Sequence, residues 1–182
     1  MNRHLRRKQK KEGNKKNNIQ SKLIEAINFH SNKHFEKAER IYTQLNELSP
    51  NNYDVLRHLG ILNQDLGRLE EAYNFFQEAI KVKPDGFEAL NNLGTIHVLN
   101  KNQNLALKCF EKSNNINPNY VPTINNLAGL YHRLHNSSES LKYSKKALSL
   151  QPSNPLALNQ HAKALVLNNK IDEGIKIFQQ IC

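Results

Sequence analysis

The chain has 182 residues, a formal net charge of +10 at pH 7 and a hydrophobic content of 38%. This length fits a single domain, and no segment approaches the roughly 18 consecutive apolar residues of a membrane-spanning helix. The N-terminus lacks the apolar region of a secretory signal, and Cys109 and Cys182 form no motif with each other or with the histidines. These features argue against a membrane span, favour a reducing compartment and predict a cytoplasmic location.

The basic charge is concentrated at the N-terminus. Residues 1–18 hold eight Lys or Arg and one Glu, which gives +7, so the rest of the chain carries only +3. The segment has no apolar stripe whose burial could offset its ordering entropy, so we predict a disordered basic tail over residues 1–18. This tail is either a solvated leader or an arm that contacts the phosphates of nucleic acid or another anionic surface. The residues of that arm are Arg3, Arg6, Arg7, Lys8, Lys10, Lys11, Lys15 and Lys16.

A fixed period organises the rest of the chain. Four prolines, Pro50, Pro84, Pro118 and Pro152, follow one another at equal intervals, which indicates stacked structural repeats. Two small residues and one bulky apolar residue recur at fixed positions in the period. These columns are Ala26, Gly60, Gly94, Ala128 and Ala162; Ala38, Ala72, Ala106, Ser140 and Gly174; and Tyr42, Phe76, Phe110, Tyr143 (one position early) and Phe178.

Each period contains two apolar stripes with helical spacing, separated by a short polar turn. The small residues allow close approach of two helices, and each proline ends the second helix because the residue before it is driven out of the helical region. We therefore predict an all-α solenoid of antiparallel helix pairs over residues 19–182. The expected repeats are about 19–52, 53–86, 87–120, 121–154 and an incomplete fifth at 155–182. Lys22 and Glu25 make the first repeat more polar, as expected where no neighbour precedes it.

These columns resemble those of the tetratricopeptide repeat family, whose period of about 34 residues is also the interval between the prolines. The second repeat fits best, with Leu56, Leu59, Gly60, Ala72, Phe76, Ala79 and Pro84 at the family's positions. The resemblance implies a right-handed superhelix in which the first helix of each repeat lines a concave groove. It further implies that the groove binds a peptide or a helix of a partner protein.

Two neighbouring columns of the first helices are expected to face this groove and are rich in side-chain amides. Their members are Arg57 and His58, Asn91 and Asn92, Asn125 and Asn126, and Asn159 and Gln160. An amide both donates and accepts hydrogen bonds, so it can pair with a peptide backbone of any sequence. The row resembles the asparagine ladder of O-linked N-acetylglucosamine transferases, in which Asn92, Asn126 and, by similarity, Gln160 would hold polypeptide. The alternative is that these asparagines have a structural or merely solvated role.

A second kind of groove, the carboxylate clamp of chaperone adaptors, does not fit this sequence. Such a clamp needs several charged donors around a terminal carboxylate. Of the required positions only Asn92 matches, and Arg57 is a loose substitute. Binding of a chaperone tail is therefore not expected.

No catalytic motif, cofactor motif or metal-ligand set is present. His30 and His34 straddle a turn, and His132 and His135 have no Cys or carboxylate beside them, whereas a zinc site gathers three or four ligands. His97 is expected to be a packed, hydrogen-bonded residue. The sequence thus predicts no enzyme activity, no cofactor and no metal.

The predicted function is a scaffold that binds a protein or peptide partner in the groove. One alternative is the substrate-recognition arm of a larger glycosyltransferase or sulfotransferase, because the chain stops at "IFQQIC" with no polar capping helix. Another is association with nucleic acid or the ribosome through the basic tail. The sequence gives no basis for predicting the oligomeric state.

Overall fold

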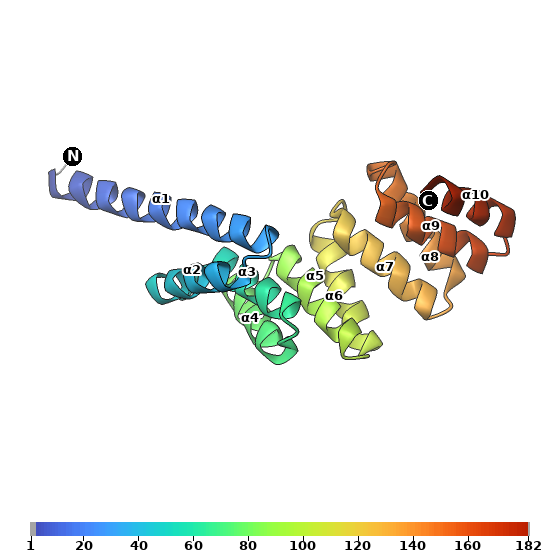
Figure 1. Ribbon diagram of the computed structural model, residues 1–182, viewed down its shortest axis with the longest axis horizontal. Helices are drawn as coiled ribbons and strands as arrows, with labels where there is room; N and C mark the ends of the chain where they lie inside the picture. Colours follow the sequence, from blue (N-terminus) through green and yellow to red (C-terminus); the bar gives the residue numbers. More distant parts are fainter. Residues whose placement is uncertain (1–2, 182) are drawn as a thin grey trace. The chain divides into compact units, whose positions relative to one another are not determined.

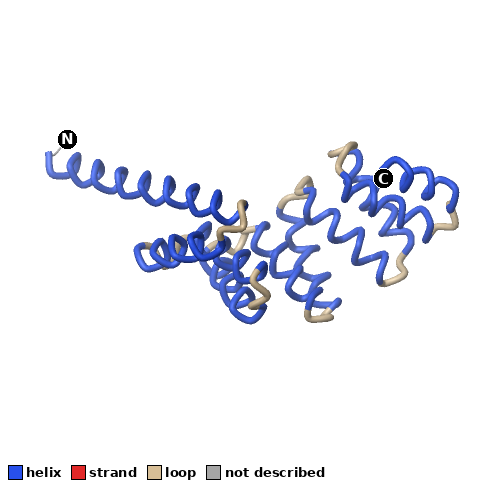
Figure 2. The backbone as a smooth tube through the Cα atoms, in the orientation of Figure 1, coloured by secondary structure: helices blue, strands red, loops and turns tan. Residues whose placement is uncertain are grey.

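The computed structural model describes the backbone of residues 3–181 and the side chains of residues 17–180. Within the described backbone there are ten helices and no strand, joined by short turns (Figure 1, Figure 2). They are α1 (Arg3–Ser31), α2 (Phe35–Leu48), α3 (Tyr53–Asp65), α4 (Leu69–Val82), α5 (Phe87–Leu99), α6 (Gln103–Ile116), α7 (Val121–Arg133), α8 (Ser137–Leu150), α9 (Pro155–Leu167) and α10 (Ile171–Ile181). The all-α solenoid of paired helices is confirmed. No helix among the described residues is long and apolar enough to cross a membrane.

The chain forms two compact units. Unit 1 spans Met1–Pro84 and contains α1 to α4, and unit 2 spans Asp85–Cys182 and contains α5 to α10. In each unit, odd-numbered helices are the first helices of the repeats and even-numbered helices are the second ones. Each unit is described by itself below.

Prolines set where the second helices end. The last residues of α2, α4, α6 and α8 each lie two positions before a periodic proline. The residue between helix and proline has left the helical region, for example with φ −135° and ψ 89° at Lys83 and φ −141° and ψ 80° at Gln151. This is the conformation that a following proline imposes, since its ring excludes the helical region.

A left-handed turn joins the two helices of every repeat. One column has positive φ throughout: Lys33 (60°), Gly67 (75°), Lys101 (60°), His135 (55°) and Asn169 (61°). The next N–H reaches back five residues to a carbonyl, as from Arg68 to Asn63 at 2.8 Å and from Asn102 to His97 at 2.8 Å. This is the Schellman pattern, which satisfies carbonyl groups at a helix C-terminus. Only Gly67 adopts it without steric cost.

Small residues bring the paired helices together. A Cβ placed on Gly60 would lie 2.5 Å from the Phe76 ring, and one on Gly94 would lie 2.5 Å from the Phe110 ring. Both rings are almost fully buried. In the fourth repeat the equivalent buried position belongs to Ser144. The aromatic predicted one position early, Tyr143, is only partly buried and stacks on Tyr131 at 5.7 Å.

Helix α1 is longer than predicted. It begins at Arg3, so residues 3–18 are helical where the sequence predicted a disordered tail. The segment has no proline, and its Lys, Arg and Gln residues have high helix propensity, so the first helix of repeat one continues toward the N-terminus. The N-terminal half of α1 extends past the end of α2 (Figure 1).

Candidate functional site

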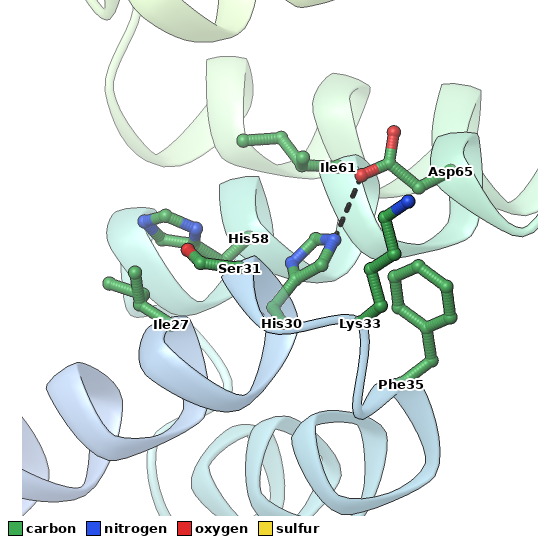
Figure 3. A pocket seen from close by; sticks show the side chains of 8 residues that line it. All are labelled: Ile27, His30, Ser31, Lys33, Phe35, His58, Ile61 and Asp65. Atoms are coloured by element: carbon green, nitrogen blue, oxygen red, sulfur yellow. Dashed lines mark hydrogen bonds and ion pairs between the residues drawn. The ribbon is translucent and has the colours of Figure 1, made fainter.

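Unit 1 contains a pocket of about 510 Å³ that is open to the surface. Helices α1 and α3 supply most of its wall, and the turn after α1 with the start of α2 supplies the rest (Figure 3). Its lining residues are Ile27, His30, Ser31, Lys33, Phe35, His58, Ile61 and Asp65. We call it the unit 1 pocket.

A histidine that is hydrogen-bonded to a carboxylate lies at the centre of the unit 1 pocket. The His30 Nε2 atom lies 2.9 Å from the Asp65 carboxylate oxygen, so this nitrogen carries the proton that it donates (Figure 3). The His30 ring meets Phe35 edge to face at 5.7 Å and Tyr42 at 6.2 Å. Two aromatic contacts and one hydrogen bond therefore fix the orientation of this imidazole.

His58 is held in its neutral form. Its ring stacks on Tyr42 at 5.8 Å, and Arg57 Nη2 lies 3.0 Å from His58 Nε2, which must accept this hydrogen bond. Burial, reinforced by the charges of Arg57 and His30, lowers the pKa of His58 to about 3. At neutral pH the ring therefore keeps its proton on Nδ1. Burial also raises the pKa of Tyr42 to about 12, although Arg57 acts in the opposite direction.

Unit 2 contains a smaller pocket of about 210 Å³. Its wall comes from three first helices, α5, α7 and α9, with one aromatic residue of α6. The lining residues are Thr95, Val98, Leu99, Phe110, Asn125, Asn126, Gly129, Leu130, Arg133 and Gln160. We call it the unit 2 pocket.

The two pockets occupy equivalent positions of the repeat. Six residues of the unit 1 pocket have a counterpart in the unit 2 pocket two whole periods further along the chain. The pairs are Ile27 and Thr95, His30 and Val98, Ser31 and Leu99, His58 and Asn126, Ile61 and Gly129, and Asp65 and Arg133. The same backbone positions therefore build both pockets, with different side chains.

The predicted asparagines of unit 2 form an internal hydrogen-bond network. Asn126 Nδ2 donates to Asn91 Oδ1 at 2.9 Å, and Asn91 Nδ2 lies 3.4 Å from Asn92 Oδ1. Thr123 Oγ1 lies 3.0 Å from Asn91 Oδ1 and 2.7 Å from Ser113 Oγ, which in turn lies 2.8 Å from the Phe87 carbonyl oxygen. Two hydroxyl protons are shared among these three oxygen–oxygen contacts.

Burial separates the two predicted amide columns. Asn91 and Asn125 are only 5% and 2% exposed, whereas Asn92 and Asn126 are partly exposed. The Asn125 Oδ1 atom is buried and has no hydrogen-bond partner among the described residues, and the same holds for Asn92 Nδ2. An amide oxygen buried in this way is costly, so its environment calls for a donor.

The remaining predicted site residues are placed as follows. Arg57, Asn159 and Gln160 are partly buried, and the Gln160 amide packs over Gly129, where a Cβ would lie 2.9 Å from its Nε2. The side chains of the predicted anion-binding residues, Arg3 to Lys16, lie outside the described residues.

The prediction overlooked several pocket residues, including Ile27, His30, Asp65, Val98 and Arg133. They lie further along the same first helices, one to two turns after the amide columns. Following every groove-facing column of the period would have found them. Among the described side chains, no group of three or more His, Cys, Asp or Glu could hold a metal ion.

Two family models of the tetratricopeptide repeat match the chain. One matches residues 29–95, and the other matches residues 87–120 and 121–154. Together they cover more than half of the chain. No curated protein matches it in sequence.

Solved structures of repeat proteins share the fold. The chain is 21% identical to a Pseudomonas aeruginosa PilF structure, with a TM-score of 0.77, 90% of this chain covered and 74% of that one. It is 16% identical to a tetratricopeptide repeat protein of Thermus thermophilus, with a TM-score of 0.76 and coverages of 90% and 89%. It is 18% identical to MamA from Desulfovibrio magneticus, with a TM-score of 0.72 and coverages of 90% and 92%. At these identities the similarity concerns the fold alone.

Proposed function

Because the chain belongs to the tetratricopeptide repeat family, whose repeats form protein-interaction scaffolds, we propose that it binds a polypeptide partner along its first helices. The proposed activity is recognition by a surface and involves no reaction. The partner would lie as an extended segment across successive first helices of a unit.

The equivalence of the two pockets is the observation that supports this proposal most directly. Both pockets are lined by the same columns of the first helices, although they lie in different units and differ in six side chains. A hollow that recurs with the period arises from the backbone of the repeat. An extended polypeptide also has a regular spacing, so a periodic surface can contact it at several points.

The chemistry of the unit 2 pocket fits a polypeptide backbone. Amide side chains from two first helices, Asn125 and Asn126 on α7 and Gln160 on α9, meet apolar side chains such as Leu130. Amides pair with backbone N–H and C=O groups, and apolar walls accept side chains. In unit 1, Arg57 and His58 stand at the equivalent positions and offer polar contacts of another kind.

A photo-crosslinking experiment with matched positions tests this proposal. Peptides are first selected from a displayed random library on the full chain. A photoreactive amino acid is then placed at Leu99, which lines the unit 2 pocket and is 50% exposed, or at Leu105, which is 45% exposed on α6 and does not line it. The selected peptides are expected to crosslink at the first position and not at the second.

Two outcomes would contradict the proposal. One is a library that yields no binding peptide. The other is equal crosslinking at both positions, which would mean that peptides adhere to exposed leucines wherever they occur.

A further inference from the structure

We propose that the unit 2 pocket recognises an extended segment in which an aliphatic residue stands next to an acidic one. This inference rests on the proposed function and adds the chemistry of the bound segment. Three features of the pocket carry it: an unpaired amide oxygen, an apolar floor and a cation at one end.

The unpaired oxygen belongs to Asn125. This residue is 2% exposed and lines the pocket, and its Oδ1 has no hydrogen-bond partner among the described residues. The neighbouring Asn126 Nδ2 already donates to Asn91 Oδ1. The Thr95 hydroxyl is also engaged, because it donates to the Asn91 carbonyl oxygen at 3.2 Å. Asn125 Oδ1 exposes less than 1 Å² of surface, so a bound peptide would have to displace a covering side chain before its backbone N–H could satisfy this oxygen.

The floor of the pocket is apolar. Phe110 is 1% exposed and Leu130 is 2% exposed, and Val98 and Leu99 complete this side of the lining. Gly129 carries no side chain, and the Gln160 amide packs over it beside this floor. A cavity of about 210 Å³ is small for a ligand site, so it fits one aliphatic side chain better than a large aromatic one.

The positive charge of Arg133 lies at the end of the pocket and favours an acidic residue at the adjacent place in a bound peptide. Arg133 is exposed at the C-terminal end of α7, and no acidic residue is among the residues that line this pocket. In unit 1 the same column holds Asp65, which is paired with His30, whereas the counterpart of His30 in unit 2 is the apolar Val98. Val98 cannot pair with Arg133 as His30 pairs with Asp65. The Arg133 guanidinium would therefore pair with a carboxylate of the ligand.

Unit 2 is also the more basic part of the repeats. Residues 85–182 contain ten Lys or Arg and six Asp or Glu, which gives +4, whereas residues 19–84 contain eight and nine, which gives −1. Unit 1 with residues 1–18 included carries +6, so overall charge does not direct an acidic segment to unit 2. Arg133 lines the pocket and would itself fix the position of the carboxylate.

The test repeats the peptide selection on three full-length chains: wild type, Arg133→Glu and Lys108→Glu. Lys108 is exposed on α6 and does not line the pocket, so it controls for the change in net charge. Wild type and Lys108→Glu are expected to enrich peptides with Asp or Glu at one fixed place next to an aliphatic residue. Arg133→Glu is expected to enrich Lys or Arg at that place.

Affinity measurements on one selected peptide sharpen the result. Changing its acidic residue to the matching amide should weaken binding to wild type by about fivefold, as for an exposed ion pair of about 1 kcal/mol, and should not weaken binding to Arg133→Glu. Methylating its backbone nitrogens one at a time should reveal one position with a loss of about fivefold, where the N–H meets Asn125. A uniform response to methylation would overturn the role of Asn125.

The outcomes separate this inference from the proposed function. Selected peptides without enrichment of acidic residues, or with the same enrichment on Arg133→Glu, would overturn the inference and leave polypeptide binding intact. Failure to select any peptide on wild type would overturn both.

Discussion

Unit 1 and unit 2 solve the same packing problem with different chemistry. In unit 1, Leu23, Leu45 and Val55 lie in one buried apolar cluster. The residues two periods later in unit 2 are Asn91, Ser113 and Thr123, which are equally buried but joined by hydrogen bonds. The same three columns therefore accommodate either an apolar cluster or a hydrogen-bonded one. A buried polar group without a partner is what the fold cannot accommodate cheaply.

Introducing one unit 2 residue into unit 1 should produce the largest effect. Leu45→Ser places in the apolar cluster the residue found at Ser113, without the hydroxyl and carbonyl groups that surround Ser113. The lost leucine contacts, the cavity and the unpaired hydroxyl should lower the free energy of unfolding by about 3–5 kcal/mol. Urea denaturation followed by circular dichroism measures this loss. Leu48→Ser, on the same helix at 54% exposure, should cost little, and an equal loss from both would refute the comparison.

Acid should lower stability differently at the repeat position that holds His58 in unit 1 and Asn126 in unit 2. The pKa of His58 is about 3 in the folded chain, below its ordinary value of 6.5, so below pH 6.5 the unfolded chain binds a proton that the folded chain does not. Stability is therefore lost as pH falls from about 6.5 toward about 3, and the loss between pH 7 and pH 5 is about 2 kcal/mol.

The measurement is the pH dependence of urea unfolding in wild type and in His58→Asn, which copies Asn126. Burial also lowers the pKa of His97, His132 and His161, so both proteins lose some stability in acid. Wild type should lose about 2 kcal/mol more than the variant. Parallel pH profiles would show that His58 titrates normally.

The reverse exchange, Thr123→Val in unit 2, should have a smaller effect. It removes one hydroxyl, but Asn91 Oδ1 keeps the hydrogen bond from Asn126, and Ser113 keeps the Phe87 carbonyl. We expect the free energy of unfolding, measured by urea denaturation, to fall by about 1 kcal/mol. Val55→Thr, the opposite change in the apolar cluster of unit 1, should cost more, and the comparison would fail if the order were inverted.

The smallest expected effect concerns the turn column that both units share. Lys101 has φ 60° where Gly67 has φ 75°, and a left-handed conformation is strained for lysine. Lys101→Gly should therefore raise the free energy of unfolding by about 0.5–1 kcal/mol, and with it the midpoint of thermal unfolding. Lys108→Gly, within the exposed face of α6, should lower that free energy by about 1 kcal/mol, since glycine weakens a helix interior. A midpoint lowered by both changes would show that the turn carries no strain.

Much of the fold is readable from the sequence because its signals are local and periodic. A proline acts on the residue before it, and the small residue and aromatic that face each other, such as Gly94 and Phe110, recur at fixed spacing. Residues 3–18 are less readable, because their low apolar content favours disorder whereas their helix propensity favours the helix that α1 forms there, and the disordered tail stays a prediction.

The site was harder to predict because its contacts are not local. The sequence marks Asn91–Asn92 as a pair of amides that recurs one period later, but the hydrogen bond from Asn126 to Asn91 depends on how α5 packs on α7. Ser113 and Thr123 gave no signal, since each is an ordinary small polar residue until the fold joins them. Whether the amide columns bind a partner stays a prediction.

The left-handed turns also govern which changes in length the chain can absorb. Every repeat has its positive φ in the same column, followed by the same backbone hydrogen bond across the turn. Gain or loss of one whole period keeps each helix in phase with its neighbours, and it adds or removes one set of first-helix side chains. Gain or loss of a few residues within a helix shifts the small residue away from its aromatic partner, by about 100° of rotation per residue. Duplication of whole repeats is therefore the change of length by which such a chain can vary its binding surface without losing its fold.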